Sequence, residues 1–187
     1  KAIHFSSKDV LVGIAASGRT PYVIGAMEYA KSIKATTIAL TCSPNSVIDK
    51  LGNIGIAPTP GPEVITGSTR LKSATAQKLI LNMISTASMI KLGKVYSNFM
   101  VVDQATNKKL VERTISIVMN ATGVDYDTAK KTLERCNYWA KQAVLMILCN
   151  LNEKEALLLL RKNNGKITDI IKLNRQAKYE NSCKDIK

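Results

Sequence analysis

The chain has 187 residues, enough for one compact domain or for a domain with a small helical appendage. Apolar residues make up 45% of the chain, but no run is long enough to span a membrane, so we expect no membrane association. The four cysteines form no C-x-x-C pair and there is one histidine, which excludes the common zinc and iron–sulfur patterns. We therefore expect reduced thiols in a cytoplasmic protein, with no metal site and no cofactor.

The net charge of +13 is distributed unevenly along the chain. Residues 70–113 hold eight cations and two anions, and residues 161–187 hold eight cations and three anions. A basic middle suits an anionic ligand, and a basic end suits a solvated segment. Nucleic acid is the usual alternative for such a charge, but no aromatic-rich basic strand or zinc-finger spacing supports it. We place nucleic acid last among the possible partners.

Short apolar runs alternate with helical patterns in the first third of the chain. The predicted elements are a strand at 10–15, a helix from Pro21 to about Lys34, a strand at 35–41, a short helix at 47–51 and a strand at 54–57. This alternation predicts an α/β fold with a doubly wound parallel sheet, and the continuous run at 10–15 predicts a strand buried on both faces. Three strands are few, so we expect the N-terminal part of the sheet to lie outside this chain.

The rest of the chain reads as helices. The pattern at 70–92 is apolar nearly all round, which predicts a central, buried helix. A second helix at 107–121 ends before Gly123, a residue typical of helix C-termini. Asp125 is a predicted N-cap, and Asn152 with Glu155 forms a predicted capping box.

These patterns predict three segments. Residues 1–118 form the sheet domain, residues 119–172 form a small three-helix domain, and residues 173–187 form a basic, flexible tail.

The first candidate site is the loop between the first strand and its helix. It contains Ser17, Gly18, Arg19 and Thr20. Ligands of parallel sheets bind at the carboxyl ends of strands, and a helix N-terminus offers free N–H groups to an anion. The hydroxyls and the guanidinium suit a phosphate or a sugar. The alternative is an ordinary strand-to-helix turn with a capping hydroxyl.

The second candidate site is the loop that enters the long helix. Hydroxyl, glycine and cationic residues are concentrated in it: Thr66, Gly67, Ser68, Thr69, Arg70 and Lys72. This composition suits an anionic, polyhydroxylated ligand. The alternative is an N-capped helix whose Arg70 and Lys72 face water. Glu63 precedes these residues and is a candidate base or hinge anchor, or else a solvated loop acid.

Both loops resemble the etherase branch of the sugar isomerase (SIS) family. Residues 13–23, GIAASGRTPYV, are similar to that branch's second sugar-phosphate loop, and residues 61–72, GPEVITGSTRLK, are similar to its longest signature. The similarity covers about residues 8–172, and its last part resembles the ubiquitin-associated-like helical domain of these enzymes. Ala74 and Ser97 stand where the family usually has Gly.

The resemblance implies a reaction and a partner. Members of this branch remove the D-lactyl ether from N-acetylmuramic acid 6-phosphate by elimination and rehydration, in bacterial cell-wall recycling, and commonly form homodimers. The family's two catalytic glutamates and its first phosphate loop precede the segment that matches Asp9. Within this chain the resemblance leaves Glu63 as the acid or base to nominate. A non-catalytic sugar-phosphate sensor that regulates a partner stays open as the alternative.

Overall fold

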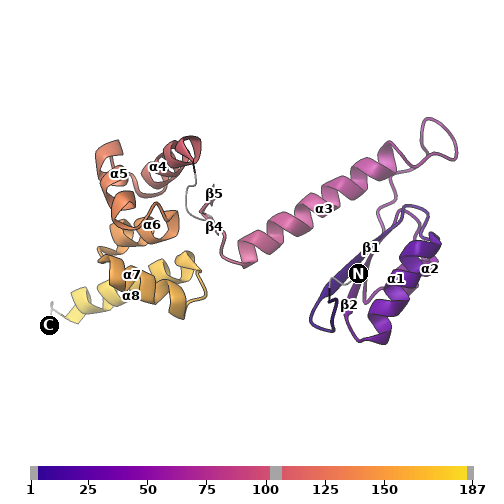
Figure 1. The fold of residues 1–187 in the computed structure, drawn as a ribbon, viewed down its shortest axis with the longest axis horizontal. Coiled ribbons are helices and arrows are strands. Elements are labelled where there is room, and N and C mark those ends of the chain that lie inside the picture. Colours follow the sequence, from indigo (N-terminus) through magenta and orange to yellow (C-terminus); the bar gives the residue numbers. More distant parts are fainter. Residues whose placement is uncertain (1–3, 102–106, 185–187) are drawn as a thin grey trace. The chain divides into compact units, whose positions relative to one another are not determined.

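The protein is described by a computed structural model that covers residues 4–101 and 107–184, shown in Figure 1. Contacts within the chain divide it into two compact units, Lys1–Ser85 and Thr86–Lys187. We call them the N-terminal unit and the helical unit, and describe each by itself. Within the predicted segments, residues 1–3, 102–106 and 185–187 lie outside the described residues.

The N-terminal unit contains a three-stranded parallel sheet. Its elements are β1 (Val10–Ile14), α1 (Pro21–Ser32), β2 (Thr36–Leu40), α2 (Val47–Leu51) and β3 (Ile54–Ile56). The strand order is β1-β2-β3, with Ile14 opposite Leu40 and Leu40 opposite Ile56. The predicted alternation of strands and helices is therefore confirmed, and all three strands end at one edge of the sheet.

Helices α1 and α2 of this unit pack against the sheet. Right-handed crossovers between neighbouring parallel strands place α1 and α2 on the same face, as Figure 1 shows. Met27 of α1 and Ile48 of α2 are fully buried in a cluster with Ala15 and Ala39. Pro21 occupies the first turn of α1, where its missing N–H costs nothing.

The prediction that the first strand is buried on both faces is wrong for β1. Val10 is 54% exposed and Ile14 is exposed as well. A continuous apolar run indicates a strand covered on both sides. Among the described residues, β1 pairs with β2 alone.

The prediction of a central, buried helix at 70–92 is also wrong. Helix α3 (Lys72–Lys91) forms close to the expected position, but Ser73 is its one buried residue. Leu79, Met83 and Met89 are exposed. The spacing of apolar residues predicts how wide the apolar face of a helix is. It does not predict whether another part of the protein covers that face. The described part of the chain provides no such surface.

After the end of α3, the helical unit contains a small hairpin that the sequence did not predict. Strands β4 (Val95–Tyr96) and β5 (Phe99–Met100) pair in antiparallel fashion. Ser97 in the turn has a φ of +54°, in the left-handed region that favours glycine, and it is a position where glycine was expected from the resemblance. At the other such position, Ala74 lies inside α3, where alanine is the better helix former.

Five helices complete the unit. They are α4 (Lys108–Thr122), α5 (Tyr126–Arg135), α6 (Ala140–Cys149), α7 (Glu153–Lys162) and α8 (Ile167–Lys184). The predicted ends are confirmed: Asp125 caps α5, Asn152 and Glu155 form the capping box of α7, and Gly123 ends α4 at a φ of +80°. Every helix in the described ranges falls short of the length or the hydropathy that a membrane span requires.

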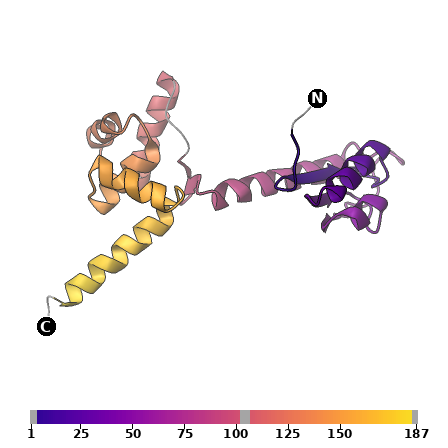
Figure 2. The ribbon, with the colours of Figure 1, turned by 60° about the horizontal axis from the view of Figure 1, so that its bottom comes forward.

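The core of the helical unit extends beyond the predicted three-helix segment. Val101 and, on α4, Ile115 and Val118 are buried in one cluster with Leu133 and Leu145 of the following helices. The predicted boundary at 118/119 therefore falls inside this unit, whose contacts begin at Thr86. Helix α8 continues into the segment 173–187. Ile167, Ile170 and Ile171 in its first turns are buried, and Figure 2 shows the rest of the helix projecting from the unit.

Candidate functional site

The first predicted loop lies at the carboxyl end of β1 and leads into α1. Gly18 adopts a φ of +65°, its N–H donates to the Ala15 carbonyl at 2.9 Å, and its carbonyl accepts from Ile48 N–H at 3.2 Å. The side chains of Ser17, Arg19 and Thr20 are exposed. The backbone of the loop is therefore fixed while its polar side chains face outward.

The hydroxyl of Thr20 does not cap α1. Thr20 is the N-cap residue, but its side chain makes no capping hydrogen bond. The alternative of a turn held by a capping hydroxyl is therefore not what the structure has. The N-terminus of a helix attracts negative charge. Together with Arg19, this end of α1 is suited to an anion.

A segment that follows β2 holds this loop in place, and the sequence did not single it out as part of the site. The carbonyl of Ala16 accepts hydrogen bonds from Cys42 N–H at 2.9 Å, Ser43 Oγ at 3.1 Å and Thr41 Oγ1 at 3.2 Å. These hydroxyls could have been found from the sequence, because they follow a parallel strand at the edge where ligands bind.

Gly18 lies against Ser46 of the same segment. A Cβ atom at position 18 would overlap the side chain of Ser46 and would lie 2.9 Å from Thr41 Oγ1. The Ser46 hydroxyl itself is buried and has no hydrogen-bond partner among the described residues. Glycine is therefore required at position 18 by both its backbone conformation and this close approach.

The second loop is closed at its base by Glu63. Its two carboxylate oxygens accept hydrogen bonds from the backbone N–H groups of Lys72 at 2.9 Å and Ser73 at 3.1 Å. The ammonium of Lys72 donates to the Pro62 carbonyl at 2.8 Å. Lys72 thus does not simply face water, and Glu63 caps α3. Its predicted role as an acid or base stays a prediction.

The remaining residues of the second loop are on the surface. Gly67 has a φ of +84°, and the Ser68 hydroxyl accepts from Arg70 N–H at 3.3 Å. Thr66, Thr69 and Arg70 are exposed. Their side chains are open to a ligand, and no described neighbour holds them in place.

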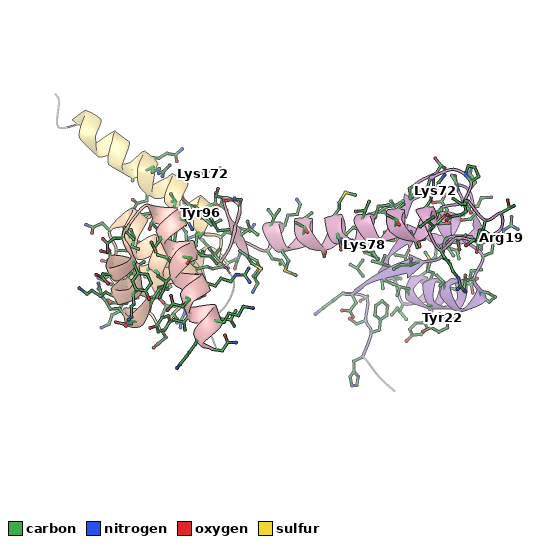
Figure 3. All side chains as sticks on the ribbon, turned by 90° about the horizontal axis from the view of Figure 1, so that it is seen from above. Arg19, Tyr22, Lys72, Lys78, Tyr96 and Lys172 are labelled. Carbon is green, nitrogen blue, oxygen red and sulfur yellow. The ribbon has the colours of Figure 1, made fainter. Side chains whose placement is uncertain are left out.

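The two loops are connected through the end of β2. Gln77 of α3 donates to the Leu40 carbonyl at 3.5 Å, and Cys42 Sγ lies 3.9 Å from the Ser73 carbonyl. The start of α3 therefore lies at the same edge of the sheet as the first loop. Figure 3 shows Arg19 and Lys72 at one end of the N-terminal unit. This edge brings together hydroxyls, cations and the N-terminus of α1, which no side chain caps.

The hydrogen bonds to Lys72 N–H and Ser73 N–H lower the pKa of the Glu63 carboxyl below its ordinary value of 4.5. Because the folded pKa is depressed, the ionised group stabilises the fold fully above pH 4.5, and this contribution is lost as the pH falls through the folded value. We expect Glu63→Gln to lower the melting temperature at pH 7, and the difference from the wild type to shrink below about pH 4.5. Thermal melts between pH 7 and pH 3 check this.

The exposed Glu28 of α1 provides a matched control, as Glu28→Gln removes the same charge without touching the cap. A gap between wild type and Glu63→Gln that stays constant across the acid range would contradict the capping role.

No group of three His, Cys, Asp or Glu side chains that could hold a metal occurs among the described residues. Burial raises the pKa of the Cys136 thiol to about 11, so this thiol stays protonated at neutral pH. A cavity of about 580 Å³ in the helical unit is lined by Lys91, Gly93, Ser97 and neighbouring residues, and none of the predicted site residues lies in it.

Comparison with known proteins supports the resemblance. Residues 2–87 match the SIS domain family. These residues belong to this family. It is 57% identical to the N-acetylmuramic acid 6-phosphate etherase of Klebsiella aerogenes over 165 residues, which make up 88% of this chain and 55% of that protein. It is 55% identical over 172 residues to the enzyme of the same name from Clostridium botulinum (strain Loch Maree / Type A3), covering 92% of this chain and 57% of that protein.

A third relative is the N-acetylmuramic acid 6-phosphate etherase of Francisella tularensis. It is 55% identical over 165 residues, 88% of this chain and 56% of that protein. The chain therefore spans a little over half the length of these curated relatives, and it corresponds to their C-terminal portion. The SIS match falls on the unit that holds both candidate loops.

Proposed function

We propose that this chain is the sugar-phosphate-binding part of an enzyme that cleaves the D-lactyl ether of N-acetylmuramic acid 6-phosphate. The products would be N-acetylglucosamine 6-phosphate and D-lactate. The observation that carries the proposal is the polar edge of the sheet, where Ser17, Arg19 and Thr20 meet the N-terminus of α1. Relatives that bear the name of this etherase support the substrate class.

The proposed reaction needs proton-transfer groups and groups that bind the sugar phosphate. A base takes the proton next to the aldehyde of the opened sugar, an acid helps the lactyl ether leave, and water then adds to the resulting double bond. In this chain the first loop would hold the phosphate through Ser17, Arg19 and Thr20. Ser68, Thr69, Arg70 and Lys72 would approach the sugar. The resemblance assigns the main proton-transfer glutamates to the part of the family's domain that precedes the match.

The capping hydrogen bonds of Glu63 bear on its proposed catalytic role. A carboxylate with a lowered pKa is a weaker base than an ordinary one, and both of its oxygens already accept backbone N–H groups. We therefore propose Glu63 as the organiser of the second loop first, and as a proton-transfer group only if that loop opens.

The experiment is a D-lactate release assay with N-acetylmuramic acid 6-phosphate, accompanied by calorimetric binding of N-acetylglucosamine 6-phosphate. We expect binding that weakens at least about tenfold in Arg19→Ala, because a charge-assisted contact to phosphate is lost. Arg113→Ala, an exposed arginine on α4, is the matched control. If neither the sugar phosphate binds nor D-lactate forms, the proposal fails for this chain.

Binding without D-lactate release would favour the alternative function. The chain would then act as a sugar-phosphate-sensing SIS module that regulates a partner. The observation behind this alternative is the location of both candidate binding loops in one unit of the chain.

We further infer a cytoplasmic homodimer with a ubiquitin-associated-like helical segment. The exposed Leu79, Met83 and Met89 on α3 support self-association, because exposed apolar stripes of this kind commonly lie at interfaces. Three successive helices, α5 to α7, lie within the segment 119–172. Sedimentation equilibrium on the same preparation checks the dimer.

A further inference from the structure

The peptide group between Ala16 and Ser17 is held more firmly than an ordinary loop peptide. Three donors, Cys42 N–H, Ser43 Oγ and Thr41 Oγ1, converge on the Ala16 carbonyl at 2.9–3.2 Å. A carbonyl oxygen accepts hydrogen bonds through two lone pairs, so three donors use its full accepting capacity and restrict rotation of the peptide group. The orientation of this peptide is therefore set by the segment after β2.

Fixing the carbonyl also fixes the amide that follows. In a trans peptide the C=O and the N–H point in opposite directions. With the Ala16 carbonyl facing residues 41–43, the Ser17 N–H is directed away from them, and no acceptor for it is present among the described residues. The exposed hydroxyl of Ser17 lies on the same residue. Both donors are thus presented beside the N-terminus of α1.

The hydroxyls that fix the peptide are themselves held in place. Thr41 is fully buried, and its hydroxyl accepts from Ser43 N–H at 3.1 Å while donating to Ala16. On the far side of the loop, Ile48 N–H holds the Gly18 carbonyl at 3.2 Å. The segment from Thr41 to Ile48 therefore holds the loop at two successive points, on either side of Ser17.

We propose that Ser43 and Thr41 are positioning residues of the sugar-phosphate site. They hold the Ala16–Ser17 peptide so that the Ser17 amide and hydroxyl face the anionic group of the ligand. This proposal rests on the proposed function, and neither hydroxyl itself needs to touch the ligand. Ser43 is the better target for a test, because it is half-buried and its loss leaves the buried Thr41 in place.

The test uses the 187-residue chain with Ser43→Ala, Ser43→Thr and a matched control, Ser32→Ala. Ser32 makes the same kind of bond, from its hydroxyl to the Tyr29 carbonyl at 2.8 Å, at the far end of α1. Two quantities are measured: hydrogen–deuterium exchange of the peptide covering residues 15–20, and the affinity for N-acetylglucosamine 6-phosphate. Melting temperatures of the three variants show whether they are folded to the same extent.

We expect Ser43→Ala to speed exchange at residues 15–20 and to weaken binding by about fivefold to tenfold, in keeping with the loss of one hydrogen bond. Ser43→Thr keeps the hydroxyl and should restore both quantities, whereas Ser32→Ala should change neither. A purely structural role for Ser43 would lower the melting temperature without changing affinity, and that result would overturn the proposal.

The exchange measurement separates this proposal from the proposed function. If the wild-type chain binds no sugar phosphate, the proposed function fails, and exchange at residues 15–20 still decides whether Ser43 positions the loop. Exchange in Ser43→Ala that is no faster than in Ser32→Ala refutes the positioning role, whatever the wild type binds.

Discussion

Replacing Gly18 by alanine is expected to destabilise the N-terminal unit by about 2–4 kcal/mol and to abolish sugar-phosphate binding. Two effects add at this position. The φ of +65° is unfavourable for any residue with a Cβ atom, and that atom would overlap the side chain of Ser46. Relief of the overlap would displace the loop that carries Ser17 and Arg19. Urea unfolding followed by circular dichroism, together with calorimetric binding, measures both losses.

The matched control for this change is Gly25→Ala on α1. A Cβ atom at position 25 would meet nothing within 4 Å, so the substitution should stabilise the helix slightly. The double variant Gly18→Ala with Ser46→Gly should recover the part of the loss due to overlap and leave the part due to φ. Equal stabilities of Gly18→Ala and the wild type would show that the loop does not have this conformation.

The second large effect is expected in the helical unit, from Leu145→Ala on α6. Leu145 is fully buried in the main cluster, so its truncation should cost about 3 kcal/mol through lost burial and the cavity left behind. Trp139 is the single tryptophan of the chain and packs against this cluster. Its fluorescence during urea unfolding therefore reports the stability of this unit directly.

Leu158→Ala is the control, because Leu158 is 53% exposed on the neighbouring helix α7. It should change the midpoint of unfolding only slightly. If Leu145→Ala and Leu158→Ala shift the Trp139 transition by similar amounts, the assignment of Leu145 to the core is wrong.

The sequence by itself determined the elements whose signals are local. Pro21 at the start of α1, Asp125 and Asn152 as N-caps, and Gly123 as a C-terminal residue each act through neighbouring backbone groups. For this reason the helix positions and the parallel β-α-β order were predictable. The location of Ser17–Thr20 at the end of a strand followed from the same order.

Only the tertiary structure decided which groups meet. The hydroxyls of Thr41 and Ser43 lie 25 and 27 residues from the Ala16 carbonyl that they bind, and the Glu63 cap spans nine and ten residues. Such contacts depend on how strands pair and helices pack. A local sequence pattern does not predict this long-range arrangement. Burial was missed for the same reason: β1 and α3 have the composition of covered elements, but coverage depends on neighbouring surfaces rather than on the element's own residues.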